Sequence, residues 1–235
     1  MANREDQVAN TICYSLFASG APMPLQNRVL PSGEIVAIPQ RGLFVGNRGI
    51  IHDPATRTLL RKRWSTHAWL ACVLEFRGRR RKVMQRRSWT ELFFLDEATA
   101  FAAGHRPCFY CRRDDANRFR AAWEKGNRLS ATLAPDMDAV LHRERFASAK
   151  KLHPLPMRIE KLPDGTMVRA GEEDFMIVQG RPLLWTPSGY RAAKGNIKDA
   201  KLLTPPSVVL AFSAGYRPVI HPSVGMALPG SKASS

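Results

Sequence analysis

The sequence predicts an α+β fold in which small mixed or antiparallel sheets are combined with short helices around a zinc-knuckle-like Cys-x-x-Cys turn. Three observations support this class. The first sixty residues or so are rich in Gly and Pro and contain short apolar runs, a pattern typical of short strands joined by turns. Helix start and stop signals bracket short segments in the middle of the chain. Turn signals then separate further apolar segments after residue 160.

The N-terminal half is expected to be mainly strands. Their ranges are 34–38, 42–45, 67–76 and 91–95. The Gly-Asn-Arg-Gly segment at 46–49 reads as a turn or a close-approach loop. The apolar run 67–76 predicts a largely buried strand. It is followed by a basic turn over 77–82, so that 91–95 returns beside it as the second strand of a hairpin.

Two helices flank the Cys-x-x-Cys pair. Asp96 is a good N-cap for a helix over 97–103, and Gly104 follows that helix as its stop residue. The second helix covers 112–125 and carries acidic residues in its first turn, where they interact favourably with the helix dipole. The two cysteines therefore lie in a tight turn between a helix end and a helix start.

The C-terminal half is expected to begin with a helix over 136–150, capped by Asp136 and carrying the apolar residues Val140, Leu141 and Phe146. Strands at 175–178 and 183–185 follow, with turn signals at 162–166 and 179–182. A last helix is predicted to start with Thr204 as cap and proline at its first position, and to end at Gly215.

A short internal repeat joins the two halves. Residues 103–107 and 214–218 match at four of five positions, and each follows a predicted helix. The repeat is either a shared helix-stop device or a pair of equivalent corners that face one site. We expect a basic α/β unit over 1–130 and a helix plus β-rich part over 131–226, packed together as one globule, with a disordered tail at 227–235.

Composition limits the possible partners. The 235-residue chain has 36 Lys and Arg against 20 Asp and Glu, a formal net charge of +16. Such an excess attracts polyanions, of which nucleic acid is the commonest. No apolar run is long enough to span a membrane, and the mixed-charge N-terminus does not resemble a signal peptide. Four unevenly spaced cysteines do not suggest a disulfide framework, so a cytoplasmic location is expected.

The positive charge is concentrated between residues 77 and 87. The predicted nucleic-acid contacts are the seven basic residues Arg77, Arg79, Arg80, Arg81, Lys82, Arg86 and Arg87. Arginine suits bidentate contacts with phosphate, although a solvated turn that keeps the chain soluble would look similar. Nearby aromatic residues could stack on bases or lie in the core: Trp64, Trp69, Trp89 and Tyr110.

Cys108 and Cys111 are candidate metal ligands, because thiolates at this spacing commonly supply half of a zinc site. The start of a helix also favours the thiolate form. A redox pair and simple packing are the alternatives. No second Cys-x-x-Cys is present to complete the site. The candidates for the remaining ligands are Cys72, His105, His67 and His52.

The segment 94–111 resembles part of a known family. It contains a Glu-Ala pair at 97–98, an Ala-Gly pair at 103–104 and Arg-Pro-Cys-x-x-Cys at 106–111, and is similar to the second half of the metal-binding domain of Ada-type DNA alkylation-repair proteins. The resemblance implies a zinc-bound scaffold that contacts DNA phosphates. It does not extend to the upstream ligand pair that accepts a methyl group, so methyl transfer is not implied. The whole chain also resembles bacterial proteins of unassigned function.

The leading hypothesis is a zinc-stabilised nucleic-acid-binding protein in DNA repair or defence, with DNA preferred over RNA as partner. The second is a nucleic-acid-processing enzyme, a nuclease or base-removing hydrolase. Its acid and base candidates are His52, Glu91, Asp96 and His221. Each has a structural alternative, such as helix capping for Asp96, and they do not form a recognisable catalytic set. The third is a basic structural protein that binds RNA or an acidic partner.

Overall fold

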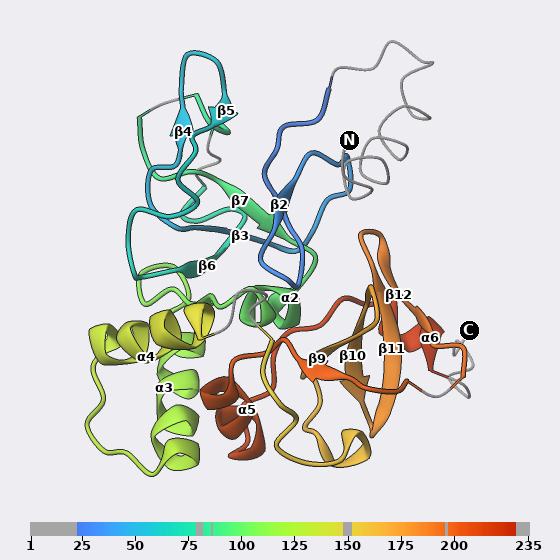
Figure 1. The fold of residues 1–235 in the computed structure, drawn as a ribbon. Coiled ribbons are helices and arrows are strands. Elements are labelled where there is room, and N and C mark those ends of the chain that lie inside the picture. The colour runs from blue at the N-terminus through green and yellow to red at the C-terminus, as the bar shows by residue number, and fades with distance from the viewer. Residues whose placement is uncertain (1–22, 79–81, 86, 148–151, 196, 229–235) are drawn as a thin grey trace.

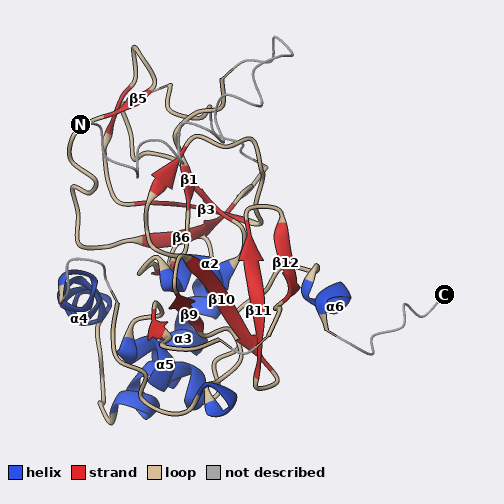
Figure 2. Cartoon of the chain, turned by 45° about the vertical axis from the view of Figure 1, so that its right-hand side comes forward, coloured by secondary structure: helices blue, strands red, loops and turns tan. Residues whose placement is uncertain are grey.

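The computed structural model describes residues 23–78, 82–85, 87–147, 152–195 and 197–228. One sheet lies at the top of the molecule and the other at the lower right, and helices lie at the lower left and between the sheets (Figure 1). Helix α2 (Glu97–Ala102) lies between the two sheets in both views (Figure 1, Figure 2). The predicted α+β class with small mixed and antiparallel sheets is confirmed.

The N-terminal sheet has six short strands in the order β2-β1-β7-β3-β6-β8. Their bounds are β1 (Arg28–Val29), β2 (Ile35–Val36), β3 (Phe44–Asn47), β6 (Leu70–Val73), β7 (Leu92–Phe94) and β8 (Arg106–Pro107). The β1–β7 and β6–β8 pairs are parallel and the others are antiparallel. A separate small ladder joins β4 (His52–Asp53) to β5 (Thr58–Leu59).

The predicted hairpin between 67–76 and 91–95 is wrong, because β3 lies between β6 and β7 and pairs with both. All four residues of β3 are buried. Gly46, predicted to lie in a turn, is in this strand. A Cβ atom at Gly46 would lie 1.9 Å from the carbonyl oxygen of Leu70, so only glycine permits β3 to approach β6 this closely.

The two helices that flank the cysteine turn lie close to their predicted positions. Asp96 caps α2 by accepting a hydrogen bond from the backbone N–H of Thr99. Gly104 follows α2 with φ of 81°, a conformation that favours glycine. Helix α3 spans Arg113–Asn127. Every residue of α2 is buried, and its alanines and Phe101 contribute to three different hydrophobic clusters.

Helix α4 (Ala134–Phe146) begins earlier than predicted. Leu133, not Asp136, is the N-cap residue, and the carboxylate of Asp136 accepts a hydrogen bond from the Leu133 N–H. The helix therefore starts two residues before Asp136, which lies in its first turn. Of the apolar residues predicted on this helix, Leu141 is fully buried and Phe146 is 54% exposed.

The C-terminal sheet is antiparallel, in the order β12-β11-β10-β9-β13. Its strands are β9 (Met167–Ala170), β10 (Glu173–Val178), β11 (Arg181–Thr186), β12 (Gly189–Ala192) and β13 (Lys201–Leu202). A short 3-10 helix, η2 (Ile159–Lys161), precedes the sheet. Gln179 and Gly180 both have positive φ between β10 and β11, as expected for a two-residue hairpin turn.

The last helices are α5 (Pro206–Ser213) and α6 (Val224–Ala227). Pro205, not Thr204, is the N-cap of α5; the Thr204 hydroxyl accepts a hydrogen bond from the Met167 N–H instead. No helix in the described part of the chain is both long and apolar enough to cross a membrane.

The internal repeat forms the same helix-stop geometry twice. Gly104 and His105 donate their N–H groups to carbonyls at the end of α2, and Gly215 and Tyr216 donate theirs at the end of α5. The Tyr216 hydroxyl donates to Glu97 at the start of α2. Arg112, which follows Cys111, pairs with the same carboxylate at 2.7 Å. The shared helix-stop device is therefore present in both copies, and the interpretation that the two corners face one site stays a prediction.

The predicted division near residue 130 falls between α3 and α4, and stays a prediction. Hydrophobic clusters contain residues from both parts, for example Ala98 with Met176 and Phe119 with Phe212. The predicted tail lies outside the described residues from 229 onward, while Ala227 belongs to α6.

We predict that Gly46→Ala lowers the free energy of unfolding by about 2 kcal/mol or more, because its methyl group would separate β3 from β6. Gly225→Ala is the matched control, since a Cβ atom there meets nothing within 4 Å. Urea unfolding of both variants measures the difference. Equal stability of the two variants would contradict the close approach at Gly46.

Candidate metal centre

Three cysteines from separate parts of the sequence meet at the edge of the N-terminal sheet. Cys72 lies in β6, Cys108 follows β8, and Cys111 precedes α3. Strand β8 pairs with β6 in parallel, and the Cys108 N–H donates to the Ala71 carbonyl at 3.0 Å. This pairing places Cys108 beside Cys72, and the tight turn returns Cys111 to both. The three sulfur atoms all lie within 4.8 Å of one another.

This spacing fits one bound metal ion. Zinc binds thiolate sulfur at about 2.3 Å in tetrahedral geometry, which puts two ligand sulfurs about 3.8 Å apart. The three thiols can therefore act as ligands to a single ion with small side-chain adjustments. Among the residues that the structure describes, the group consists of these cysteines alone, which leaves one tetrahedral position for another ligand.

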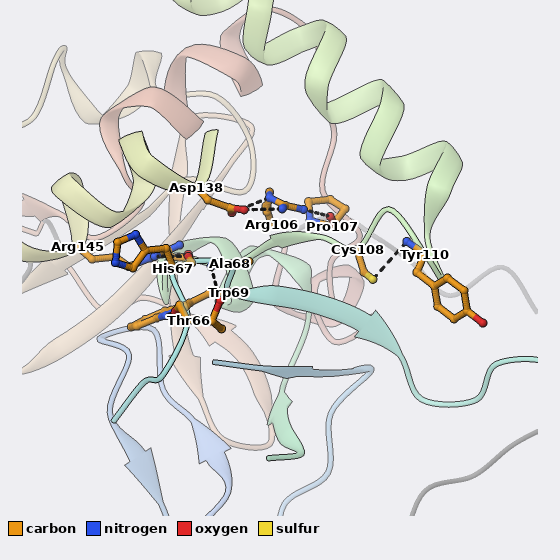
Figure 3. A network of polar contacts seen from close by, with 11 residues as sticks. Thr66, His67, Ala68, Trp69, Arg106, Pro107, Cys108, Tyr110, Asp138 and Arg145 are labelled. Atoms are coloured by element: carbon orange, nitrogen blue, oxygen red, sulfur yellow. Dashed lines mark hydrogen bonds and ion pairs between the residues drawn. The ribbon is translucent and has the colours of Figure 1, made fainter. Parts of the chain in front are cut away.

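The surroundings of the sulfurs favour a thiolate at Cys108. Hydrogen bonds from the Cys111 and Cys72 thiols lower the pKa of Cys108. The Tyr110 backbone N–H also points to the Cys108 sulfur, at 3.4 Å (Figure 3). Hydrogen bonding to Cys108 and Cys111, together with burial, raises the pKa of Cys72. A bound cation would instead lower the pKa of Cys72, because a coordinated thiol loses its proton.

One side of the cysteine group is apolar and the other reaches solvent. Val45 packs against Cys72 and Cys108, with Trp89 and Phe93 partly buried against the same cluster. Cys111 is half-buried, and Tyr110 between the two turn cysteines is 69% exposed. The site is therefore anchored in the sheet while its turn presents an aromatic ring at the surface.

Arg112 connects the turn to the helices on both sides. Its guanidinium lies 2.7 Å from the Glu97 carboxylate of α2 and 2.8 Å from Asp115 of α3. It also covers the ring of Phe44 in β3, at 4.5 Å from the ring centre. Arg112 and Glu97 are buried, so these contacts hold the residue after Cys111 in one place.

Helix α4 is bound to β8 and to the segments that precede β8 and β6 (Figure 3). Arg106 of β8 makes a two-pronged contact with Asp138, at 2.8 and 2.7 Å. Arg145 donates to the carbonyl oxygens of Gly104 and His67, at 3.0 and 2.9 Å. Both guanidiniums are buried. They fix the segments that lead into Cys108 and Cys72 against one helix.

The candidate histidine ligands lie elsewhere. His105 is buried between the rings of Trp69 and Phe94, and its Nε2 lies 3.3 Å from Arg48 Nε. Side chains alternate along extended chain, which sends His105 to the face opposite Cys108. His67 is exposed and stacks on His142, while His52 is buried with its Nδ1 2.7 Å from the Thr90 hydroxyl.

Part of the basic segment can be placed beside the cysteine turn. Arg77 is exposed, and its guanidinium lies 5.1 Å from the ring centre of Phe76 and 5.9 Å from that of Tyr110. Lys82 and Arg87 are exposed as well. The remaining four predicted contacts, Arg79, Arg80, Arg81 and Arg86, lie outside the described residues.

Each of the four candidate acid and base residues makes a contact that a structural role explains. His52 contacts Thr90, and Glu91 accepts the Met84 N–H at 2.9 Å. Asp96 is fully buried as the cap of α2, and burial raises its pKa. The His221 backbone N–H donates to Asp96, while its ring contacts Ser223. The enzyme hypothesis therefore stays a prediction.

Helix α4 also carries an aromatic pair that was not among the predicted site residues. His142 and Phe146 lie one turn apart and contact each other, with ring centres 5.0 Å apart. Their spacing of four residues in a predicted helix is the sequence signal that could have identified them.

Comparisons with protein families, with curated proteins and with solved structures find no match.

We predict that purified protein binds one zinc ion per chain and that Cys72→Ser and Cys108→Ser each abolish it, because each removes one of three ligands. His105→Asn should keep the metal. Elemental analysis of folded protein gives the metal content. Loss of zinc in His105→Asn, with Cys72→Ser unchanged, would contradict the three-cysteine site.

We predict that Asp138→Asn costs about 3 kcal/mol of folding free energy, since it leaves the buried Arg106 charge without its carboxylate partner. Glu160→Gln breaks the exposed ion pair with Arg158 and should cost about 0.5 kcal/mol or less. Urea unfolding compares the two. Similar small effects would show that α4 is not held through Arg106.

Proposed function

We propose that this chain is a zinc-stabilised nucleic-acid-binding protein in which the three-cysteine site holds a recognition surface in place. Zinc at Cys72, Cys108 and Cys111 would cross-link β6, the end of β8 and the start of α3. The ion would supply structural stability, since binding to a preformed cluster adds to folding free energy. The protein side chains would make the contacts with nucleic acid.

The observation that carries the proposal is the position of Tyr110. It lies inside the Cys-x-x-Cys turn, 69% exposed, with the Arg77 guanidinium over its ring. Phe76 adds a second ring, centred 5.2 Å from that of Tyr110. Aromatic rings and arginine together are the usual means of holding a base and its phosphate. A metal that fixes Cys108 and Cys111 would also fix Tyr110 between them.

The charge distribution supports the same partner. Among the described residues, four arginines are buried, and so are five carboxylates. Burial therefore removes nearly as many negative as positive side chains from the surface, and the positive excess of the chain stays exposed. A surface of this kind binds polyanions with affinity that falls steeply as salt rises.

DNA is the partner that the resemblance to Ada-type proteins favours, and repair or defence the corresponding role. The part of that family's domain that is similar here contains Cys108 and Cys111 as its second ligand pair. Zinc is the ion that thiolate ligands at this spacing favour. The three cysteines are free thiols, which fits a reducing cytoplasm.

We predict that Tyr110→Ala weakens DNA binding about tenfold through loss of ring stacking, while Tyr110→Phe binds normally. Arg77→Ala should lower affinity and reduce the salt dependence by the contribution of about one phosphate contact. Arg181→Ala, an exposed arginine of the C-terminal sheet, is the matched control.

Fluorescence anisotropy with labelled DNA, repeated over a salt series and after treatment with a zinc chelator, measures these effects. Chelation should weaken binding and lower the melting temperature together. Binding that is unchanged by Tyr110→Ala, by Arg77→Ala and by chelation would contradict the proposed role of the cysteine site.

A further inference from the structure

Four aromatic rings gather at the surface where α4 meets the segment before β6. Trp64, His67, His142 and Phe146 form this group, called the aromatic cluster below. The His67 and His142 rings are stacked, with centres 3.8 Å apart and planes 18° apart. The ring centre of Trp64 lies 4.9 Å from that of His142 and 5.9 Å from that of Phe146.

The aromatic cluster differs from the packing rings of this protein in its exposure. Core rings such as Phe101, Phe119 and Trp123 are 1% exposed or less. In contrast, Phe146 is 54% exposed, His67 is exposed, and Trp64 and His142 are only partly buried. Rings that served packing alone would gain more from burial. This cluster keeps ring surface available to a partner.

Two buried residues, Arg145 and Trp69, fix the backbone on which the aromatic cluster is built. Arg145 of α4 donates to the His67 carbonyl, and its guanidinium covers Trp69 at 4.3 Å from the ring centre. The Trp69 indole N–H in turn donates to the Thr66 carbonyl at 3.0 Å (Figure 3). Helix α4 and the segment that contains His67 are therefore held together before a ligand binds, which reduces the entropy lost on binding.

Positive charge surrounds the aromatic cluster. Arg61, Lys62 and Arg63 directly precede Trp64 and are all exposed, and Arg143 is exposed beside His142. The acidic residues of α4 are engaged in other contacts. These contacts are Asp136 with the Leu133 N–H, Asp138 with Arg106, and Glu144 with Ser207.

We propose that the aromatic cluster is a second nucleic-acid contact, one that stacks on unpaired bases of a single strand while the 61–63 basic run holds its phosphates. Stacking requires bases whose faces are free, which a continuous duplex does not offer. The proposal rests on the proposed function and adds that the protein prefers single-stranded or locally opened nucleic acid. This surface is distinct from the cysteine turn, since His67 and Tyr110 lie on opposite sides of Arg106 and Cys108 (Figure 3).

The test compares a labelled oligothymidylate with a duplex of the same length, by fluorescence anisotropy at one salt concentration. Phe146→Ala and Trp64→Ala should each weaken single-strand binding about tenfold and change duplex binding by about twofold or less. Trp64→Phe keeps a ring and should bind normally. Leu133→Ala removes an exposed side chain (63%) at the other end of α4 and is the matched control.

Because Trp64 is partly buried, thermal melting by circular dichroism accompanies each variant, and Phe146→Ser provides a second test at an exposed position. Equal loss on single strand and duplex, or no loss on either, would overturn the proposal. If Arg77→Ala weakens binding while Phe146→Ala and Phe146→Ser do not, this inference alone fails. If the wild-type protein binds neither nucleic acid at low salt, the proposed function fails with it.

Discussion

The parallel pairing of β8 with β6 is the constraint on which the candidate site depends. It sets Leu70 opposite Arg106 and Ala71 opposite Pro107, and the Cys108 N–H extends the ladder by one more bond. A slip of one residue would turn every side chain of β8 to the other face and separate Cys108 from Cys72. Because β8 has only two residues, its register needs support from outside the sheet. Gly104, which ends α2 sharply, and Pro107, which restricts the chain direction, supply part of that support.

Buried arginines supply the rest. Arg106 binds α4 and Arg112 binds α2. Arg145 binds the backbone at Gly104 and at His67. Removing charges from water is costly unless they are paired and hydrogen-bonded. Arg48 and Arg145 meet this requirement only in part: burial first, and then a neighbouring arginine, lowers the pKa of each to about 9. The two guanidiniums cover Trp69, at 4.0 and 4.3 Å from its ring centre.

Local signals predicted the helices well and the sheet pairing poorly. Asp96 and Gly104 identify the ends of α2 because capping and positive φ depend on neighbouring residues. The hairpin expected around the basic turn was wrong because the insertion of β3 depends on Gly46 and on distant partners. Cys72 and His105 were both candidate ligands from the sequence. The pairing of β8 with β6 brings Cys72 to Cys108, and strand alternation turns His105 away. The stacking of His67 on His142 joins residues 75 positions apart, and a single sequence contains no local signal for it.

X-ray absorption at the zinc edge of the purified protein tests the central claim most directly, because it reports the ligand atoms around the metal whether or not a function is known. The structure predicts three sulfur neighbours at about 2.3 Å with one lighter atom or a further sulfur. It also predicts that the zinc signal is lost in Cys72→Ser, which removes one of the three ligands. A first shell with nitrogen and oxygen only, or two sulfurs unchanged by Cys72→Ser, would contradict the account.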